Sequence, residues 1–284
     1  MKKVISLLLP LAFMQAQTPA ANGFHSAVTA RRVVGLPSRN ASAASPSVVI
    51  QGRVLPRILS DSTWETTVVL VNTGSAPVAY QQFFFAADGK PASYTIHASA
   101  ASGDITASAI QGILAPGSSS RLSLSDTSGS FREGWSLLTY DEGPGVVDGY
   151  AIIRRRGLSA GFNPETTVTF SSMRDYSVYM PYDNTLGFRS QVTLVNPAVN
   201  LPSQVRLTYL NPQGQVLLVD SLTLQPEQQV TLVLPDTYPD LANRTGSLLV
   251  ESDIDRFSVT GLRCDASGAI GALPTMNRSE FLPR

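Results

Sequence analysis

The hydrophobic pattern of the chain centres on one nine-residue stretch that occurs twice. Residues 64–72 read WETTVVLVN and residues 188–196 read FRSQVTLVN, so each copy begins with an aromatic residue and ends in Leu-Val-Asn. Apolar residues first alternate with polar ones and then run together, which is typical of a strand buried on one face and then on both. The repeat period, about 110–125 residues, is the size of a whole β-sandwich domain. The pattern therefore predicts two related β-sandwich modules.

Other short motifs recur in the same order around this stretch. The matched segments are 114–117 with 224–227, 134–138 with 246–250, and 150–154 with 259–263. The last match places Arg154 and Arg263 at equivalent positions. The offset falls from 125 residues at Gly89 to 110 residues at Leu114, so module one contains 15 extra residues between Lys90 and Ile113. We expect this insertion on the outside of the first module.

About seven short strands per module, with turn sequences between them, predict an all-β fold of two tandem immunoglobulin-like or fibronectin-like sandwiches. The predicted divisions are a signal peptide at 1–16, a disordered linker at 17–46, module one at 47–156, a hinge at 157–162, module two at 163–275 and a C-terminal tail at 276–284. Only one helical turn is predicted, at 238–242.

Four motifs of module one also carry a resemblance. They are 64–72, 114–117, Gly134-Trp135 and 149–152. Together they resemble tandem sandwich modules in uncharacterised secreted proteins of soil bacteria. The resemblance covers roughly residues 47–275, and module two departs from it because Ser247 stands where module one has Trp135. It implies a fold and an exported location, and it supplies no catalytic residues.

The N-terminus predicts export. Met1-Lys2-Lys3 is positively charged, and the apolar stretch from Val4 to Met14 is about 11 residues long, too short to span a bilayer as a helix. We predict a signal peptide cut after Ala16, a secreted or periplasmic protein, and no transmembrane segment. A single cysteine, Cys264, forbids an intrachain disulfide and favours a bacterial style of secretion.

Charge and motifs exclude several classes of function. The formal net charge is zero, which argues against nucleic-acid binding. Serine or cysteine catalysis needs a positioned histidine, and the two histidines, His25 and His97, lie in no catalytic motif. The acidic residues near 141–148 and 252–256 occur in hairpins and match a calcium loop poorly. We therefore predict no catalytic residues, no cofactor and no metal site.

The candidate binding residues are Trp135, Arg154, Arg155 and Arg156, all in module one. Trp135 has no counterpart in module two, so it is the candidate for an exposed ligand platform, with a core position as the alternative. The arginines could contact an anion or partner, or could close the sandwich against carboxylates. Phe83-Phe84-Phe85 places aromatic rings on both faces of one strand, so at least one should meet the other module or a partner.

The sequence thus favours an exported, non-catalytic binding or structural protein that contacts an unknown protein or glycan at the cell surface, a polymer or another partner. Two alternatives stay open: a secreted hydrolase with a site at the module junction, and an accessory subunit of an envelope or secretion assembly that uses an exposed strand edge. The sequence does not define the oligomeric state.

Overall fold

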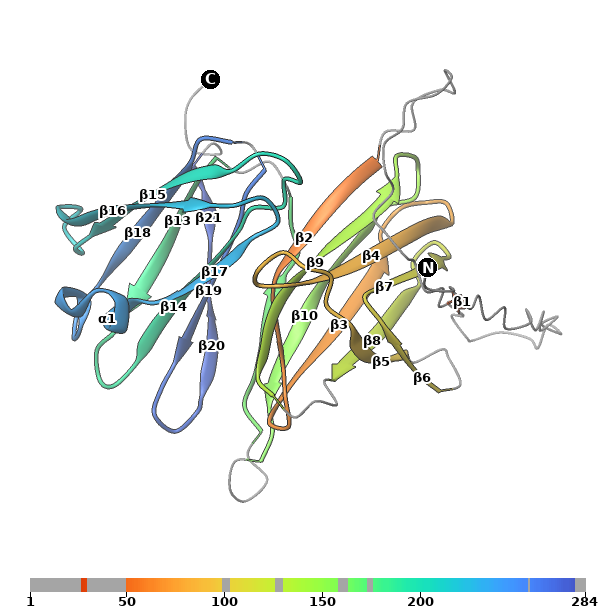
Figure 1. Ribbon diagram of the computed structural model, residues 1–284, viewed down its shortest axis with the longest axis horizontal. Helices are drawn as coiled ribbons and strands as arrows, with labels where there is room; N and C mark the ends of the chain where they lie inside the picture. The colour runs from red at the N-terminus through yellow and green to blue at the C-terminus, as the bar shows by residue number, and fades with distance from the viewer. Residues whose placement is uncertain are drawn as a thin grey trace, which may run out of the picture.

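The computed structural model of the chain describes residues 27–29, 50–98, 103–125, 130–157, 163–172, 176–254 and 256–278. They form two β-sandwiches, each made of two antiparallel sheets (Figure 1), so the predicted all-β fold is confirmed. The predicted signal peptide lies outside the described residues. No helix in the described part of the chain is long and apolar enough to cross a membrane.

Module one consists of sheets A and B. Sheet A contains, in order, β1 (Ala27–Thr29), β7 (Ala109–Leu114), β4 (Val78–Ala86), β9 (Arg132–Asp141), β2 (Ile50–Ser60) and β12 (Ser171–Ser172). Sheet B contains β11 (Glu165–Thr169), β10 (Val147–Arg155), β3 (Trp64–Asn72), β8 (Ser119–Ser125), β5 (Tyr94–Ala98) and β6 (Asp104–Ala107). Alternate residues of the facing strands, such as Val68, Leu70 and Phe84, fill the core between the sheets.

Module two consists of sheets C and D. Sheet C contains β16 (Val216–Leu224), β15 (Ser203–Leu210), β18 (Thr245–Ser252), β13 (Ser177–Asp183) and β21 (Met276–Asn277). Sheet D contains β17 (Gln229–Val233), β14 (Arg189–Val195), β19 (Ser258–Cys264) and β20 (Ile270–Leu273). A short helix α1 (Leu234–Thr237) and a 3₁₀ turn η2 (Pro239–Leu241) follow β17. η2 lies within the predicted helical turn at 238–242, which is confirmed, and α1 precedes it as a helix that the sequence did not predict.

The strand order repeats between the modules, which confirms the duplication. The order β7-β4-β9-β2-β12 of sheet A returns as β16-β15-β18-β13-β21 in sheet C, and β11-β10-β3-β8 of sheet B returns as β20-β19-β14-β17 in sheet D. The repeated stretch forms β3 and β14, which lie at equivalent places in the two modules.

The predicted module boundary is wrong. β10 and β11 pair as neighbours, with Arg154 opposite Glu165, and β12 pairs with β2, so both β11 and β12 belong to module one. The predicted hinge at 157–162 therefore lies between two strands of one sheet, although residues 158–162 are outside the described part. Module one extends to Ser172, and module two runs from β13 to β21, which ends at Asn277 inside the predicted tail.

The strand order also differs from the immunoglobulin arrangement, in which the first strand shares a sheet with the second and fifth, and the seventh lies with the third and sixth. Here the first strand, β2, lies beside β9, and the seventh, β10, lies beside β3.

The strand register also corrects the predicted match between Arg154 and Arg263. Arg263 pairs with Ser190, the counterpart of Thr66, and Thr66 pairs with Ile153. Arg263 is therefore equivalent to Ile153, and Cys264 to Arg154.

The extra residues of module one form β5 and β6 at the edge of sheet B, whereas β15 leads into β16 through a short turn in module two. Their inward residues Tyr94 and Ile96 are fully buried in the module core, so the insertion extends the sandwich. Within the linker that was predicted to be disordered, residues 27–29 form β1, which pairs with β7.

Candidate binding surface

Trp135 is a fully buried anchor between the two modules. It lies on the outer face of sheet A, stacked on Phe85 with ring centroids 4.3 Å apart, in a cluster that also includes Val195 of module two. Its indole Nε1 donates a hydrogen bond to the Glu227 carbonyl oxygen across the junction, at 3.1 Å. The prediction of an exposed platform is therefore wrong. The prediction that the Phe83–Phe85 strand contacts the other module is confirmed.

Polar contacts complete the junction. Gln229 Nε2 donates to the carbonyl oxygens of Pro56 (2.7 Å) and Gly134 (2.9 Å), and its backbone N–H donates to Ala87. Arg57 is buried with its Nε 3.3 Å from a Glu133 carboxylate oxygen, and burial lowers the pKa of this guanidinium while Glu133 opposes the shift. The contacts of Gln229 tie sheet A of module one to β17 of module two.

Cys264 lies near the junction as a free cysteine. Burial raises the pKa of its thiol, and nearby arginines oppose the shift. Its sulfur accepts a weak hydrogen bond from Gln191 Nε2 at 3.7 Å. A raised pKa favours the neutral thiol, which is a poor nucleophile and a poor metal ligand.

The three candidate arginines all have partners within the chain. Arg154 donates through Nε and Nη2 to Glu165 Oε2, at 2.9 and 2.6 Å, and Arg156 forms an ion pair with Glu65. The Arg155 guanidinium lies 5.6 Å from the centre of the Trp64 ring, at cation–π distance. Carboxylates therefore compensate two of the three charges, as in the alternative in which arginines close the sandwich. Anion binding here stays a prediction.

The outer face of sheet B is the open face of module one. Its outward side chains include the hydroxyl groups of Thr67, Thr95, Thr106, Ser119, Ser123, Ser125, Thr167 and Thr169, together with charged side chains such as Glu65, Arg121 and Glu165. The antiparallel register places Tyr150 on this face between Val69 of β3 and Thr169 of β11. Arg154 lies on the same face of β10, because residues four apart on a strand point the same way.

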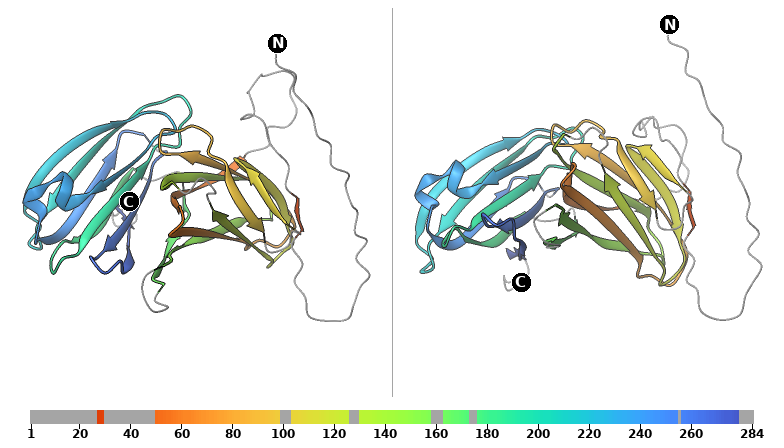
Figure 2. Two further views of the ribbon diagram at one scale, coloured as in Figure 1. Left: turned by 60° about the horizontal axis from the view of Figure 1, so that its bottom comes forward. Right: turned by 90° about the horizontal axis from the view of Figure 1, so that it is seen from below.

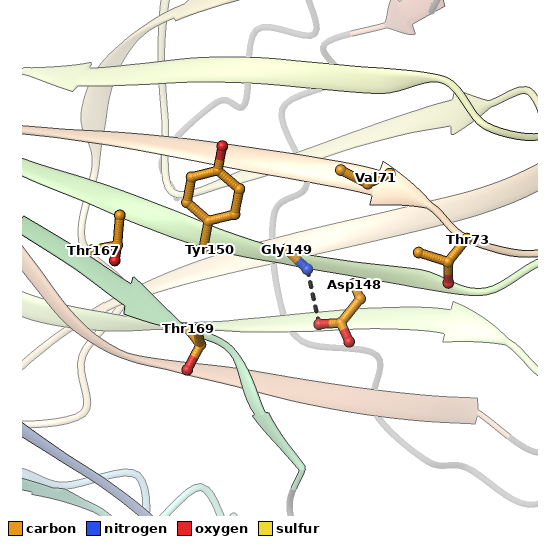
Figure 3. Close-up of a pocket in the computed structure, with 7 residues that line it drawn as sticks. All are labelled: Val71, Thr73, Asp148, Gly149, Tyr150, Thr167 and Thr169. Carbon is orange, nitrogen blue, oxygen red and sulfur yellow. Dashed lines mark hydrogen bonds between the residues drawn. The ribbon is translucent and has the colours of Figure 1, made fainter. Parts of the chain in front are cut away.

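A shallow depression of about 500 Å³ lies beside Tyr150. It forms where β11 ends: the pairing with β10 stops at Thr169, Phe170 donates its N–H to the Gly149 carbonyl oxygen (3.2 Å), and the chain then crosses to β12. Asp148 consequently has no neighbour in β11. The lining residues, drawn in Figure 3, are Val71, Thr73, Asp148, Gly149, Tyr150, Thr167 and Thr169.

The depression offers an aromatic ring surrounded by hydrogen-bonding groups. Tyr150 is 37% exposed, and the hydroxyls of Thr167 and Thr169 lie along the next strand. Asp148 accepts a hydrogen bond from the Gly149 N–H (2.8 Å), and its other oxygen lies 3.5 Å from Arg53 Nη2. Tyr150 can therefore cover an apolar patch of a ligand while threonine hydroxyls and a carboxylate contact polar groups.

Module two does not present the equivalent face. Val195 and Ser258 are the counterparts of Val71 and Asp148, and both are fully buried. Ser258 lies within hydrogen-bond distance of Ser171 of module one, with hydroxyl oxygens 2.5 Å apart. The same sheet face thus forms the junction in module two and stays open in module one.

Two titratable side chains of this face, His97 and Asp104, lie at its other edge, on β5 and β6. His97 Nδ1 lies 2.9 Å from the carboxylate of Asp104, far along sheet B from the depression. Within the described ranges no group of three or more His, Cys, Asp or Glu residues is placed to hold a metal ion.

No family model, curated protein or solved structure matches the chain. The geometry therefore defines its class: an all-β protein of two joined sandwiches, one of which presents an open, hydroxyl-rich sheet face. Sequence reasoning missed Tyr150 and the threonines of β11. The alternation of Tyr150, Ile152 and Arg154 along one strand could have predicted that Tyr150 faces outward. The threonines of β11 were missed because β11 was assigned to module two.

Proposed function

We propose that the protein is an exported, non-catalytic binding protein that holds a neutral glycan polymer on the outer face of sheet B. The observation that carries this proposal is the half-exposed Tyr150 in an open depression lined by threonines. The C–H face of a sugar ring stacks on an aromatic side chain, while its hydroxyls exchange hydrogen bonds with threonine and carboxylate oxygens.

The shape of the surface favours a polymer over a small molecule. Sites for small ligands are concave and enclose most of the ligand surface. Here the depression is open, and the face continues from Thr167 past Ile152 to Thr67 and Ser123, whose hydroxyl oxygens lie 3.2 Å apart. An extended chain can contact this face over several sugar units.

The two arginines at the end of β10 favour a neutral over an anionic glycan, and Arg121, on β8 beside β3, is a further arginine of this face. At the far end of β10, Arg154 is bound to Glu165, and Arg156 is bound to Glu65. An anionic polymer would have to compete with carboxylates that are already in place. A neutral polymer meets no such competition.

The test compares glycan binding by three forms of the chain expressed from Gln17: unchanged, Tyr150→Ala and Tyr176→Ala. Tyr176 is a matched control because it is an exposed tyrosine, at 54%, in module two. Retention is measured on cellulose, chitin and peptidoglycan, and by electrophoresis through gels containing soluble neutral glycans. We expect saturable binding of at least one glycan, weakened tenfold or more by Tyr150→Ala and unchanged by Tyr176→Ala.

Results of two kinds would contradict the proposal, the first in binding and the second in activity. One is the absence of binding to every glycan, or binding that Tyr150→Ala leaves intact. The other is the release of new reducing ends by the unchanged chain, which would indicate a hydrolase.

A further inference from the structure

The outermost strand of sheet C, β16, is an open edge. It pairs only with β15, and the β15–β16 hairpin lies at the upper left of the molecule in Figure 1. Val216, Leu217 and Val219 are 59%, 37% and 45% exposed, and Asp220 is the one charged residue of the strand. Long apolar edges of this kind present unpaired backbone groups that accept another strand.

The counterpart edge in module one is closed. β7 occupies in sheet A the place that β16 occupies in sheet C, and β1 adds to it as an antiparallel strand, with Ala27 opposite Ile113 and Thr29 opposite Gln111. The N-terminal segment therefore forms a strand on this type of edge.

The described chain of module two provides no such cover. Only four residues, 173–176, separate β12 from β13, and β21 pairs with β13 at the opposite edge of sheet C. A strand that closes β16 must therefore come from elsewhere.

We propose that β16 accepts the N-terminal segment, residues 26–34, of a second copy of the chain, so that copies join head to tail by strand addition. The segment reads SAVTARRVV and contains neither proline nor glycine, which suits an extended strand. Its two arginines, Arg31 and Arg32, complement Asp220, and the segment has no acidic residue. This inference does not rest on the proposed glycan binding.

The geometry of β16 leaves room for a longer pairing than β1 makes within its own chain. Three residue pairs join β1 to β7. Pairing of β16 with β15 is regular from Leu218 to Leu224, and its irregularity is confined to the hairpin end, at Tyr209 and Leu210. The Tyr238 hydroxyl donates to Asp220 and so holds this carboxylate at 2.7 Å.

The protein concentration then decides whether residues 26–34 pair with β7 of their own chain or with β16 of another chain. Pairing within one chain is favoured in dilute solution, because the connecting chain keeps the segment close to β7. Pairing between chains gains as the protein concentration rises.

The test uses the chain expressed from Gln17 and a fluorescent peptide of residues 26–34, with binding followed by fluorescence anisotropy. The β16 variant is Leu217→Lys with Val219→Lys, since lysines on an edge strand oppose strand addition and here also repel the two arginines. Val199→Lys is the matched control, because Val199 is an exposed valine, at 60%, outside the strands. A peptide with Val28→Pro tests the strand itself without any risk to folding, since proline lacks the N–H of a central strand residue.

We expect the peptide to bind the unchanged chain and Val199→Lys equally, and to bind the β16 variant at least tenfold more weakly. The Val28→Pro peptide should lose at least as much affinity. In sedimentation velocity, the unchanged chain should form larger species as its concentration rises, and both the β16 variant and a Val28→Pro chain should stay monomeric.

Three outcomes would overturn the proposal. Binding that survives in the β16 variant and is lost with Ile113→Lys would place the peptide on β7. Association that persists in the Val28→Pro chain but fails in the β16 variant would indicate direct β16-to-β16 pairing. A chain that is monomeric at all concentrations and binds no peptide would leave β16 as a solvated edge.

Discussion

At the residue scale, the asparagine that ends each repeated stretch explains why two motifs recur together. The Asn72 Nδ2 donates to the carbonyl oxygens of Ala76 (2.8 Å) and Leu114 (3.0 Å), and Asn196 Nδ2 donates to Leu201 (2.8 Å) and Leu224 (3.2 Å). Both asparagines are fully buried. Each one ties the end of its strand to the Leu-x-Pro motif that follows, so the two motifs form one structural unit in each module.

Asn72→Ala and Asn196→Ala should therefore each lower the free energy of unfolding by about 2–4 kcal/mol, because several buried backbone groups lose their partner. Urea unfolding measures the loss. Asn200→Ala is the control, since Asn200 is exposed in a loop, and it should change stability by less than about 0.5 kcal/mol. Losses no larger than that of the control would show that water replaces the asparagine.

Asp183 makes the stability of module two depend on pH. Hydrogen bonds from Thr185 and the nearby guanidinium of Arg263 lower the pKa of this carboxyl, and Arg263 Nη1 lies 2.7 Å from Asp183 Oδ2. Because the folded state has the lower pKa, the stabilisation is present above the unfolded value of about 3.9 and is lost as the pH falls through the folded value.

Asp183→Asn should accordingly lower the Tm at pH 7, and the difference from the unchanged chain should shrink as the pH falls below about 4. Thermal unfolding followed by circular dichroism between pH 2.5 and 7 measures this. A constant Tm difference over that range would mean that Asp183 acts through packing and not through its charge.

At the element scale, the sequence predicted strands well and their partners poorly. The alternation of apolar residues in 64–72 and 188–196 is local, so it located β3 and β14. Which strand pairs with which depends on tertiary contacts between distant segments. The alternation in 165–169 fits either module, and only its pairing with β10 assigns β11 to module one.

The same limit applies to the candidate site. Residue alternation predicts that Trp135 and Tyr150 point out of their sheets. It does not say that Val195 and Glu227 cover Trp135, or that the end of β11 leaves Tyr150 open. What lies on a sheet face depends on the packing of distant segments, which a single sequence does not encode locally.

The β5–β6 insertion should be part of the cooperative core of module one. Ile96 is fully buried, while Thr95 lies on the open face of the same strand. Ile96→Ala should therefore lower the free energy of unfolding by about 2–4 kcal/mol, and Thr95→Ala by less than about 0.5 kcal/mol. Urea unfolding of the two variants distinguishes them. Equal, small losses would show that the insertion folds apart from the sandwich.

At the scale of the whole molecule, the duplicated module uses one face in two ways. The outer face of sheet D packs on the outer face of sheet A, and the two sandwiches lie side by side in both views of Figure 2. Phe85 and Trp135 are aromatic in module one. Their counterparts in module two, Leu210 and Ser247, are not. The divergence between the copies is therefore concentrated at the junction and at the faces left open.

Trp135 should make the two modules unfold together. Its ring is buried between Phe85 and Val195, and its N–H reaches the Glu227 carbonyl oxygen, so Trp135→Ala removes packing on both sides of the junction. Truncating a buried tryptophan costs about 3–5 kcal/mol. We expect one calorimetric transition for the unchanged chain and two for Trp135→Ala, with module one melting first.

Two further variants separate coupling from simple destabilisation. Trp135→Phe keeps a stacked ring but loses the N–H donor, and it should lower the free energy of unfolding by about 1 kcal/mol while keeping a single transition. Ile96→Ala destabilises module one away from the junction, because β5 lies beside β8 and β6 in sheet B. If Ile96→Ala splits the transition as Trp135→Ala does, or if the unchanged chain already melts in two steps, then the junction does not couple the modules.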